Sequence, residues 1–333
     1  MRHEAAPFRS WRPGPRMVLL LLALATLAVA VAFLTVGLRG PVDLVLMLRG
    51  RRLAAICVVA VATAVSTVIF QTIAGNRLLT PSIMGFDALY ALVQTALVFA
   101  FGSLWLLDVN PRLLFFLEAG MMVAFALALY RWLFLGRGRS LHLMLLVGVV
   151  LGLLFRSITN LLQRMIDPNE FVVLQERLFA SFNGVALDLL AISAAVLAVV
   201  LVVVWRMRDT LDVLLLGRDQ AIGLGVDHRR TVSLVLLLVA LQVAVATALV
   251  GPLNGFEPIS FFGLLVATLA HAVLPGFRHR HLLPAAAMLG ILVLAGGQLL
   301  LEQLLGLGST VGIVTEFAGG IVFIIMLLKG IAR

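Results

Sequence analysis

The sequence predicts an all-helical membrane protein that crosses the bilayer about ten times. Hydrophobic residues make up 62% of its 333 residues and charged residues only 12%, whereas about half of a soluble domain is apolar. Apolar runs of about twenty residues, the length that spans a bilayer, recur along the chain. Charged residues gather in short segments between these runs, so the net charge of +9 indicates membrane orientation rather than nucleic-acid binding.

The first apolar run, residues 17–36, follows a basic, proline-containing tail at residues 1–16. The run is longer than the roughly 7–15 residues of a signal-peptide core, so we expect it to stay as the first transmembrane helix. Residues 17–333 then form one transmembrane domain. The other expected spans are 53–73, 86–107, 113–134, 141–163, 186–205, 231–250, 258–275, 282–302 and 310–328.

Orientation follows from the basic residues. An even number of spans places both termini on one side. If that side is the cytoplasm, the inner segments hold more than twice as many Lys and Arg residues as the outer ones. This bias predicts cytoplasmic termini. Trp105, Trp132 and Trp205 fall at predicted helix ends, where indole rings favour the headgroup layer.

Residues 206–230 form a polar segment between the sixth and seventh spans. Two leucine-rich pieces alternate with charged residues and are interrupted by Gly217, Gly223 and Gly225. This pattern predicts two short helices joined by a glycine turn. Such an element would suit the docking of a partner. An ordinary solvated loop fits the composition equally well, and the sequence leaves both readings open.

The fifth span carries Gly148, Gly152, Arg156 and Asn160 at intervals of four residues, which places them on one helix face. The glycines would let another helix approach closely. Lipid contact would be costly for Arg156 and Asn160, so we expect their face to meet protein or a water-filled path.

The last span also carries polar residues, Thr315 and Glu316, whose contact with lipid would be costly. Counting along the helices places Arg156 and Glu316 at similar depths, roughly 10 Å below the outer surface. We therefore hypothesise that they are neighbours, either as a salt bridge or as two walls of a path. A purely structural buried pair is the alternative.

Two further patterns carry weaker predictions. The expected outer loop contains LRGRR at residues 48–52; its arginines suit carboxylates of a partner, or simply lipid headgroups. VAVATA occurs at 59–64 and again at 243–248, in spans that would run in opposite directions, as in inverted repeats. Coincidence is as good an explanation in a chain so rich in Ala and Val.

Several kinds of chemistry find no support. Lys329 is the only lysine and is not part of a P-loop, so we expect no ATP hydrolysis by that route. Cys57 alone makes neither a disulfide nor a thiolate cluster. We expect no catalytic residues, no metal and no cofactor, and read His279 and His281 as interfacial residues of a short inner loop. An intramembrane enzyme is therefore not favoured.

Two motifs carry a family resemblance. Gln71, Asn76, Pro81 and Gly85 follow the second span in an expected cytoplasmic loop, although Arg77 and Leu79 depart from the familiar Asn-Pro-Leu-Ala pattern. The 206–230 segment has a Leu-Gly start at Leu216 and an Ala-x-x-Leu-Gly-Val core at Ala221. With these motifs the chain resembles the permease subunits of binding-protein-dependent ABC importers for ferric siderophores and cobalamin. GNRLLTPSIMGFDALY is similar to the catecholate-siderophore branch, in which two different permease chains often pair.

The resemblance implies a type II ABC importer permease fold in the bacterial inner membrane. It implies cytoplasmic ATP-binding subunits, a periplasmic or lipid-anchored substrate-binding protein, a second permease chain and a ferric siderophore substrate. The residues implied to couple to the ATPase are Leu216, Gly217, Arg218, Asp219, Ala221, Leu224, Gly225 and Val226. Arg49 and Arg52 take the positions that dock the binding protein. Arg156, Asn160, Thr315 and Glu316 are the expected translocation path. The family's usual Pro-His-Ile-Ala-Arg is replaced by ATLAH at 267–271. Any role of the family's histidine and arginine at these positions therefore has no support in this sequence.

The alternative is a secondary, ion-coupled transporter of a small anionic solute. The VAVATA echo and the buried Arg and Glu fit it. Dependence of uptake on ATP and on a binding protein separates the two hypotheses.

Overall fold

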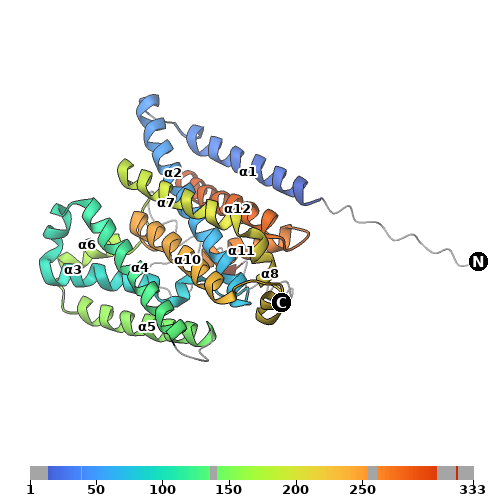
Figure 1. The fold of residues 1–333 in the computed structure, drawn as a ribbon. Helices are drawn as coiled ribbons and strands as arrows, with labels where there is room; N and C mark the ends of the chain where they lie inside the picture. Colours follow the sequence, from blue (N-terminus) through green and yellow to red (C-terminus); the bar gives the residue numbers. More distant parts are fainter. Residues whose placement is uncertain (1–13, 39, 136–140, 254–260, 306–319, 322–333) are drawn as a thin grey trace, which may run out of the picture.

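In the computed structural model, which describes residues 14–38, 40–135, 141–253, 261–305 and 320–321, the chain is a bundle of helices (Figure 1). The described part contains no strand. Eight of its helices are long and apolar enough to cross a membrane, which confirms the predicted fold class. They are α1 (Pro15–Thr35), α2 (Val42–Ala74), α3 (Phe86–Asp108), α4 (Pro111–Leu135), α5 (Leu141–Gln163), α7 (Leu187–Arg206), α10 (His228–Val250) and α12 (His279–Leu300).

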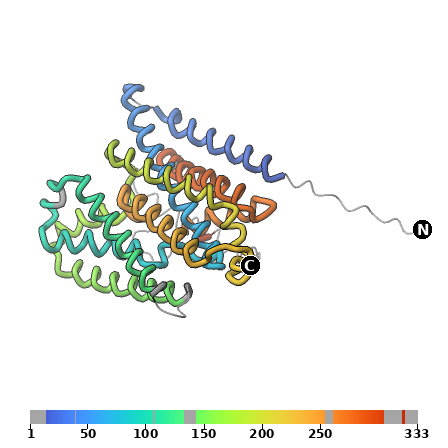
Figure 2. Tube along the Cα trace, viewed as in Figure 1, coloured from blue at the N-terminus to red at the C-terminus, as the bar shows by residue number. Residues whose placement is uncertain are grey.

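The ninth expected span corresponds to part of α12 and the eighth to the shorter α11 (Phe261–Val273). The predicted tenth span, 310–328, lies outside the described residues. A π-helical turn, η2 (Leu301–Leu305), follows α12. Figure 2 traces the chain back and forth through the bundle.

The second span differs most from its prediction. α2 has 33 residues and begins at Val42, directly after Pro41, so the LRGRR stretch is helical and the predicted outer loop is wrong there. At 1.5 Å per residue α2 is about 50 Å long, well beyond the ~30 Å hydrocarbon core. A helix that projects beyond the hydrocarbon can carry arginines without cost, which is why their charge misled the prediction.

α2 is the central helix of the bundle. It contacts α7, α10, α11 and α12, and its residues from Ala55 onward are mostly buried. Small residues allow the close packing: a Cβ on Gly290 of α12 would lie 2.9 Å from the Ala60 carbonyl oxygen of α2. α1 instead lies along the outside of the bundle (Figure 1) and exposes many leucines, such as Leu20 and Leu27.

The connection between α2 and α3 folds back into the bundle. Its short 3₁₀ helix, η1 (Pro81–Met84), packs against α5 beside Gly148, about two turns from the start of that helix. Thr80, Pro81 and Met84 are buried. Residues 80–85 are therefore packed into the bundle and do not form a solvated loop, whereas their predicted place on the cytoplasmic side stays a prediction. Irregular backbone is tolerated at this depth only where protein surrounds it, and α5 and α3 provide that surrounding.

Short helices occupy opposite ends of the bundle (Figure 1). α6 (Pro168–Arg177) lies at one end, and α8 (Arg208–Leu214) and α9 (Arg218–Gly223) lie at the other. The predicted pair of short helices within 206–230 is confirmed. Gly217 joins them with φ 97°, a left-handed conformation that costs glycine little.

Candidate docking and translocation sites

The α8–α9 surface is exposed and partly apolar. Leu216, Ile222 and Leu224 are large hydrophobic side chains that remain exposed, Leu224 by 63%. Buried Ala221 anchors α9 to the bundle. Exposed apolar residues grouped on a polar element are typical of a protein interaction site.

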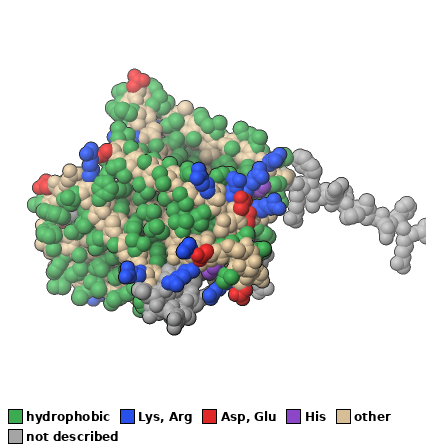
Figure 3. Space-filling view, in the orientation of Figure 1, with side chains coloured by type: hydrophobic (Ala, Val, Ile, Leu, Met, Phe, Trp, Pro, Cys, Tyr) green, Lys and Arg blue, Asp and Glu red, His purple; other side chains and the backbone are tan. Residues whose placement is uncertain are grey.

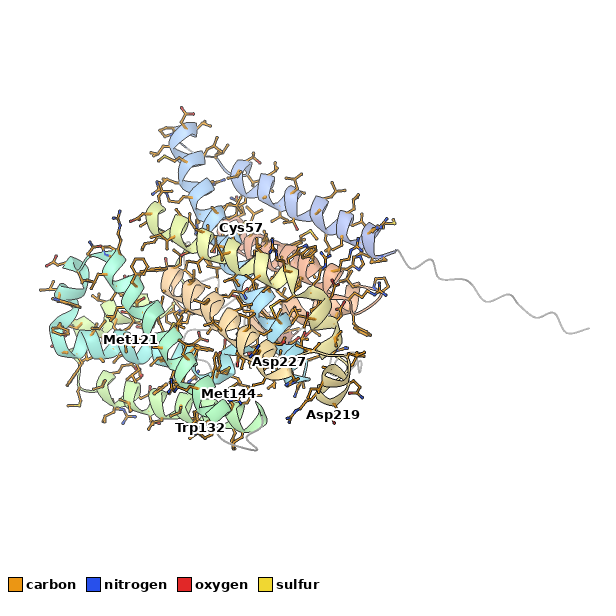
Figure 4. All side chains as sticks on the ribbon, viewed as in Figure 1. Cys57, Met121, Trp132, Met144, Asp219 and Asp227 are labelled. Atoms are coloured by element: carbon orange, nitrogen blue, oxygen red, sulfur yellow. The ribbon has the colours of Figure 1, made fainter. Side chains whose placement is uncertain are left out.

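Charged side chains surround this apolar group. Arg218 and Asp219 are exposed, and Figure 4 shows Asp219 and Asp227 at the end of the bundle where α9 leads into α10. In the face drawn in Figure 3, most Lys and Arg side chains lie toward this same end. The surface thus combines an apolar centre with a charged rim, the usual anatomy of a protein interface.

Two turns fix the shape of this surface. Gly225 has φ 86°, and the next residue, Val226, donates its N–H to the Ala221 carbonyl at 3.0 Å. Asp227 then caps α10, because its carboxylate accepts the Arg230 N–H at 3.1 Å. The predicted glycine turns are confirmed; the predicted role in ATPase coupling stays a prediction.

A buried histidine ties α8 to the bundle. Asp212 of α8 accepts hydrogen bonds from the backbone N–H of His279 at 2.8 Å, and its carboxylate lies 2.6 Å from the His279 Nδ1. The His279 Nε2 lies 2.8 Å from the hydroxyl of Thr72 near the end of α2. One side chain therefore joins α8, α12 and α2; we call these three residues the Asp212–His279–Thr72 link.

Sequence reasoning missed this link. It placed His279 in an interfacial loop, but His279 is fully buried and is the first residue of α12. The signal was present: α8 needs an inward face, and Asp212 stands between the inward-facing Leu211 and Leu214. Pairing that aspartate with a histidine 67 positions away requires the tertiary structure.

The motif after α2 builds a tight turn at the same end of the bundle. Gln71 donates its side-chain N–H to the Arg77 carbonyl at 2.6 Å, and the Asn76 side chain accepts the Leu78 N–H at 2.9 Å. The Arg77 guanidinium carbon lies 4.8 Å from the ring centroid of Phe277, in the segment before α12. These residues attach the turn to the start of α12, close to His279.

Pro81 and Gly85 have a different environment, deep in the bundle. A Cβ on Gly85 would lie 2.9 Å from the Gly152 Cα of α5, and Gly85 has φ 87°. The backbones of η1 and α5 therefore touch. The predicted close approach at Gly148 and Gly152 is confirmed, and the approaching element is η1 rather than a long helix.

Arg156 is half-buried on α5, and its charge acts on Asp87 at the start of α3. Asp87 is buried and also hydrogen-bonds the Ser82 hydroxyl of η1. Asn160 is exposed one turn beyond Arg156. Thr315 and Glu316 lie outside the described residues, so the Arg156–Glu316 pairing stays a hypothesis. Asp87, an acidic residue within FDALY that the sequence reasoning overlooked, is close enough to feel the charge of Arg156.

A small polar cavity of ≈30 Å³ adjoins Asp87, enough room for about one water molecule. α2, η1, α3 and α10 enclose it. Its polar lining residues are Thr63, Ser66, Thr67, Ser82, Asp87 and Thr247. The two VAVATA stretches face it, since Thr63 and Thr247 occupy corresponding positions in them. Their origin as inverted repeats stays a prediction.

Arg49 and Arg52 both form contacts within the chain. Arg49 donates hydrogen bonds to the carbonyl of Phe33 in the last turn of α1 and to those of Val36 and Gly37, the two residues that follow the helix. Arg52 forms a salt bridge of 2.6 Å with Glu302, which also accepts a bond from Gln298. These contacts hold α1, α2 and the end of α12 together. Direct docking of a partner by the two arginines stays a prediction.

Comparisons with known proteins agree on one family. The sequence model of the FecCD transport family matches residues 16–329. The chain is 42% identical to the petrobactin import system permease protein YclO of Bacillus subtilis, over 91% of this chain and 96% of that protein. It is 33% identical to the petrobactin import system permease protein FatC of Bacillus anthracis, over 98% and 92% of the two chains.

A solved structure shares the fold. A metal-chelate-type ABC transporter in an inward-facing conformation superposes with a TM-score of 0.81 at 23% identity, over 95% of this chain and 100% of that one.

Proposed function

Because the chain belongs to the FecCD transport family, we propose that it is the membrane-spanning permease subunit of an ABC importer that moves a ferric siderophore into the cell. The observation that carries the proposal is its 42% identity over nearly full length to a petrobactin import permease. A secondary transporter is not favoured, because the relatives are permeases of import systems.

ATP hydrolysis is assigned to separate cytoplasmic subunits, and the permease acts as a dimer with a like or homologous chain. The excess of basic residues on the side of the termini supports a cytoplasmic position for both termini in the inner membrane. That orientation also places α8 and α9 in the cytoplasm, where an ATPase subunit can reach them.

Energy coupling is assigned to the α8–α9 surface. Leu216, Ile222 and Leu224 would enter the ATPase interface, while Arg218 and Asp219 form its rim. The Asp212–His279–Thr72 link supports this role, because a charge-assisted buried contact transmits displacement of α8 directly to α2 and α12.

The translocation path is assigned to the side of α5 that carries Arg156 and Asn160, with Thr315 and Glu316 from the last span. A half-buried guanidinium near the path suits an anionic ferric chelate. The Asp87 carboxyl would offset part of this positive charge when the path is empty.

The substrate-binding protein is assigned to the opposite end, where α2 projects. Most of the exposed side chains of its first turns are apolar, among them Leu44, Met47 and Leu48, with Asp43 as an exposed acidic residue. We propose that Arg49 and Arg52 serve docking chiefly by holding this projection in place.

Uptake of labelled ferric siderophore tests the proposal. Cells that lack the chain should regain uptake with the wild-type gene, provided that the ATPase subunit and the binding protein are present. Uptake that persists without the ATPase subunit and follows an ion gradient would overturn the importer assignment.

A further inference from the structure

An apolar groove lies on the side of the bundle, and one end of it lies at the junction of α7 and α8, next to the α8–α9 surface. It has a volume of ≈400 Å³ and is formed by α2, α7 and α12, within the ~300–1,000 Å³ typical of ligand sites. Val61 of α2, Val202 of α7 and Ala287 of α12 are among its walls. Arg206 is the single charged residue among the described residues that line it.

The charge is confined to one end of the groove. Arg206 is the last residue of α7 and is exposed, and its neighbour Trp205, 42% exposed, also lines the groove. The Arg208 guanidinium carbon lies 4.7 Å from the Trp205 ring centroid. Tryptophan marks the level of the lipid headgroups, so this end of the groove opens at the membrane surface.

α12 brings a second arginine to the same end. Arg280 is exposed and stands one helical turn before Leu283 and Pro284, both of which line the groove. Residues three and four apart share a helix face, so Arg280 lies on the groove side at its mouth. The site therefore has a long apolar body and two guanidinium groups at its headgroup end.

We propose that this groove binds an anionic phospholipid, with an acyl chain between α2, α7 and α12 and the phosphate at Arg206 and Arg280. Guanidinium groups match phosphate oxygens in geometry as well as charge. The acyl chain would cover the apolar walls of the groove in place of bulk lipid. The proposal is independent of the transported substrate.

Native mass spectrometry of the full chain with its co-purified subunits tests the proposal, with phosphatidylglycerol and phosphatidylcholine of equal chain length as probes. We expect phosphatidylglycerol to be retained on the order of tenfold better, since each arginine near a membrane surface attracts anionic lipid. Arg206→Gln with Arg280→Gln should abolish this preference and leave some retention of both lipids. Arg164→Gln, an exposed arginine beyond the end of α5, is the matched control and should leave the preference unchanged.

Filling the groove tests the apolar half. Ala287→Phe should reduce retention of both lipids, and Val202→Trp provides a second filling variant if the first lowers thermal stability. Equal retention of the two lipids by the wild type would overturn the proposal, as would an unchanged preference in the double arginine variant. Displacement of the lipid by soluble glycerol phosphate would assign the mouth to a free phosphate instead.

Discussion

The two ends of the bundle both carry arginine-rich segments, yet they use them differently. At the α8–α9 end, Leu216, Ile222 and Leu224 project into water among charged neighbours. At the opposite end, Arg49 donates to carbonyls at and just after the end of α1, and Arg52 pairs with Glu302. A charge cluster in a sequence therefore does not by itself identify a docking surface. The two ends differ in which side chains remain exposed once the hydrogen bonds and ion pairs within the chain have formed.

The largest effect should come from placing a charge in the centre of the α8–α9 surface. Leu224→Asp should lower siderophore uptake by more than about tenfold, because an unpaired carboxylate buried in an interface costs several kcal/mol. Leu224→Ile is the matched control. Uptake and co-purification of the ATPase subunit measure the effect, with membrane insertion checked for both variants. Wild-type uptake by the aspartate variant would remove this surface from coupling.

A smaller but more specific effect is expected from breaking the Asp212–His279–Thr72 link. Asp212→Ala should lower uptake per ATP hydrolysed several-fold while the ATPase subunit still binds, because α8 would no longer move α12 with it. Asp212→Asn, which keeps an acceptor for the His279 N–H, should lie between this variant and the wild type. Unchanged uptake per ATP in the alanine variant would reduce the link to a structural contact.

At the other end, the Arg52–Glu302 pair should behave as a structural unit. Arg52→Gln and Glu302→Gln should each lower the free energy of unfolding by about 1–3 kcal/mol, since each leaves a partly buried partner unsatisfied. The double variant should cost little more than either single change. Thermal unfolding in detergent provides the measurement. Additive losses would show that the two side chains act separately, and the arginine would then be available for a partner.

The smallest effect on stability is expected for Arg49→Gln, about 1 kcal/mol, from the lost bonds to carbonyls at and just after the end of α1. The exposed α2 projection should matter more for docking: Met47→Asp should weaken binding of the substrate-binding protein more than Arg49→Gln does. Titration of that protein onto the permease in nanodiscs compares the two. A larger loss of binding for Arg49→Gln than for Met47→Asp would instead support direct docking by Arg49.

The spans were predictable because lipid imposes length and apolarity on each helix separately. The start of α2, the depth of η1 and the burial of His279 were not, because each depends on a neighbour distant in sequence. The residues of η1 have the Pro and Gly content of a surface turn, and only the facing Gly148 and Gly152 make the buried position possible. The glycine turn at Gly217 was predictable, since it requires only local backbone conformation.

The backbone contact between Gly85 and Gly152 restricts how the bundle can move. No side chain stands between η1 and α5 there, so no rotamer change can absorb a relative displacement. Edge-to-face contacts of Phe125 with Phe86 and Phe155 add α4 to the same assembly. Opening the bundle would then displace η1 and the adjoining parts of α3, α4 and α5 as one rigid body, with any hinge located elsewhere in the chain.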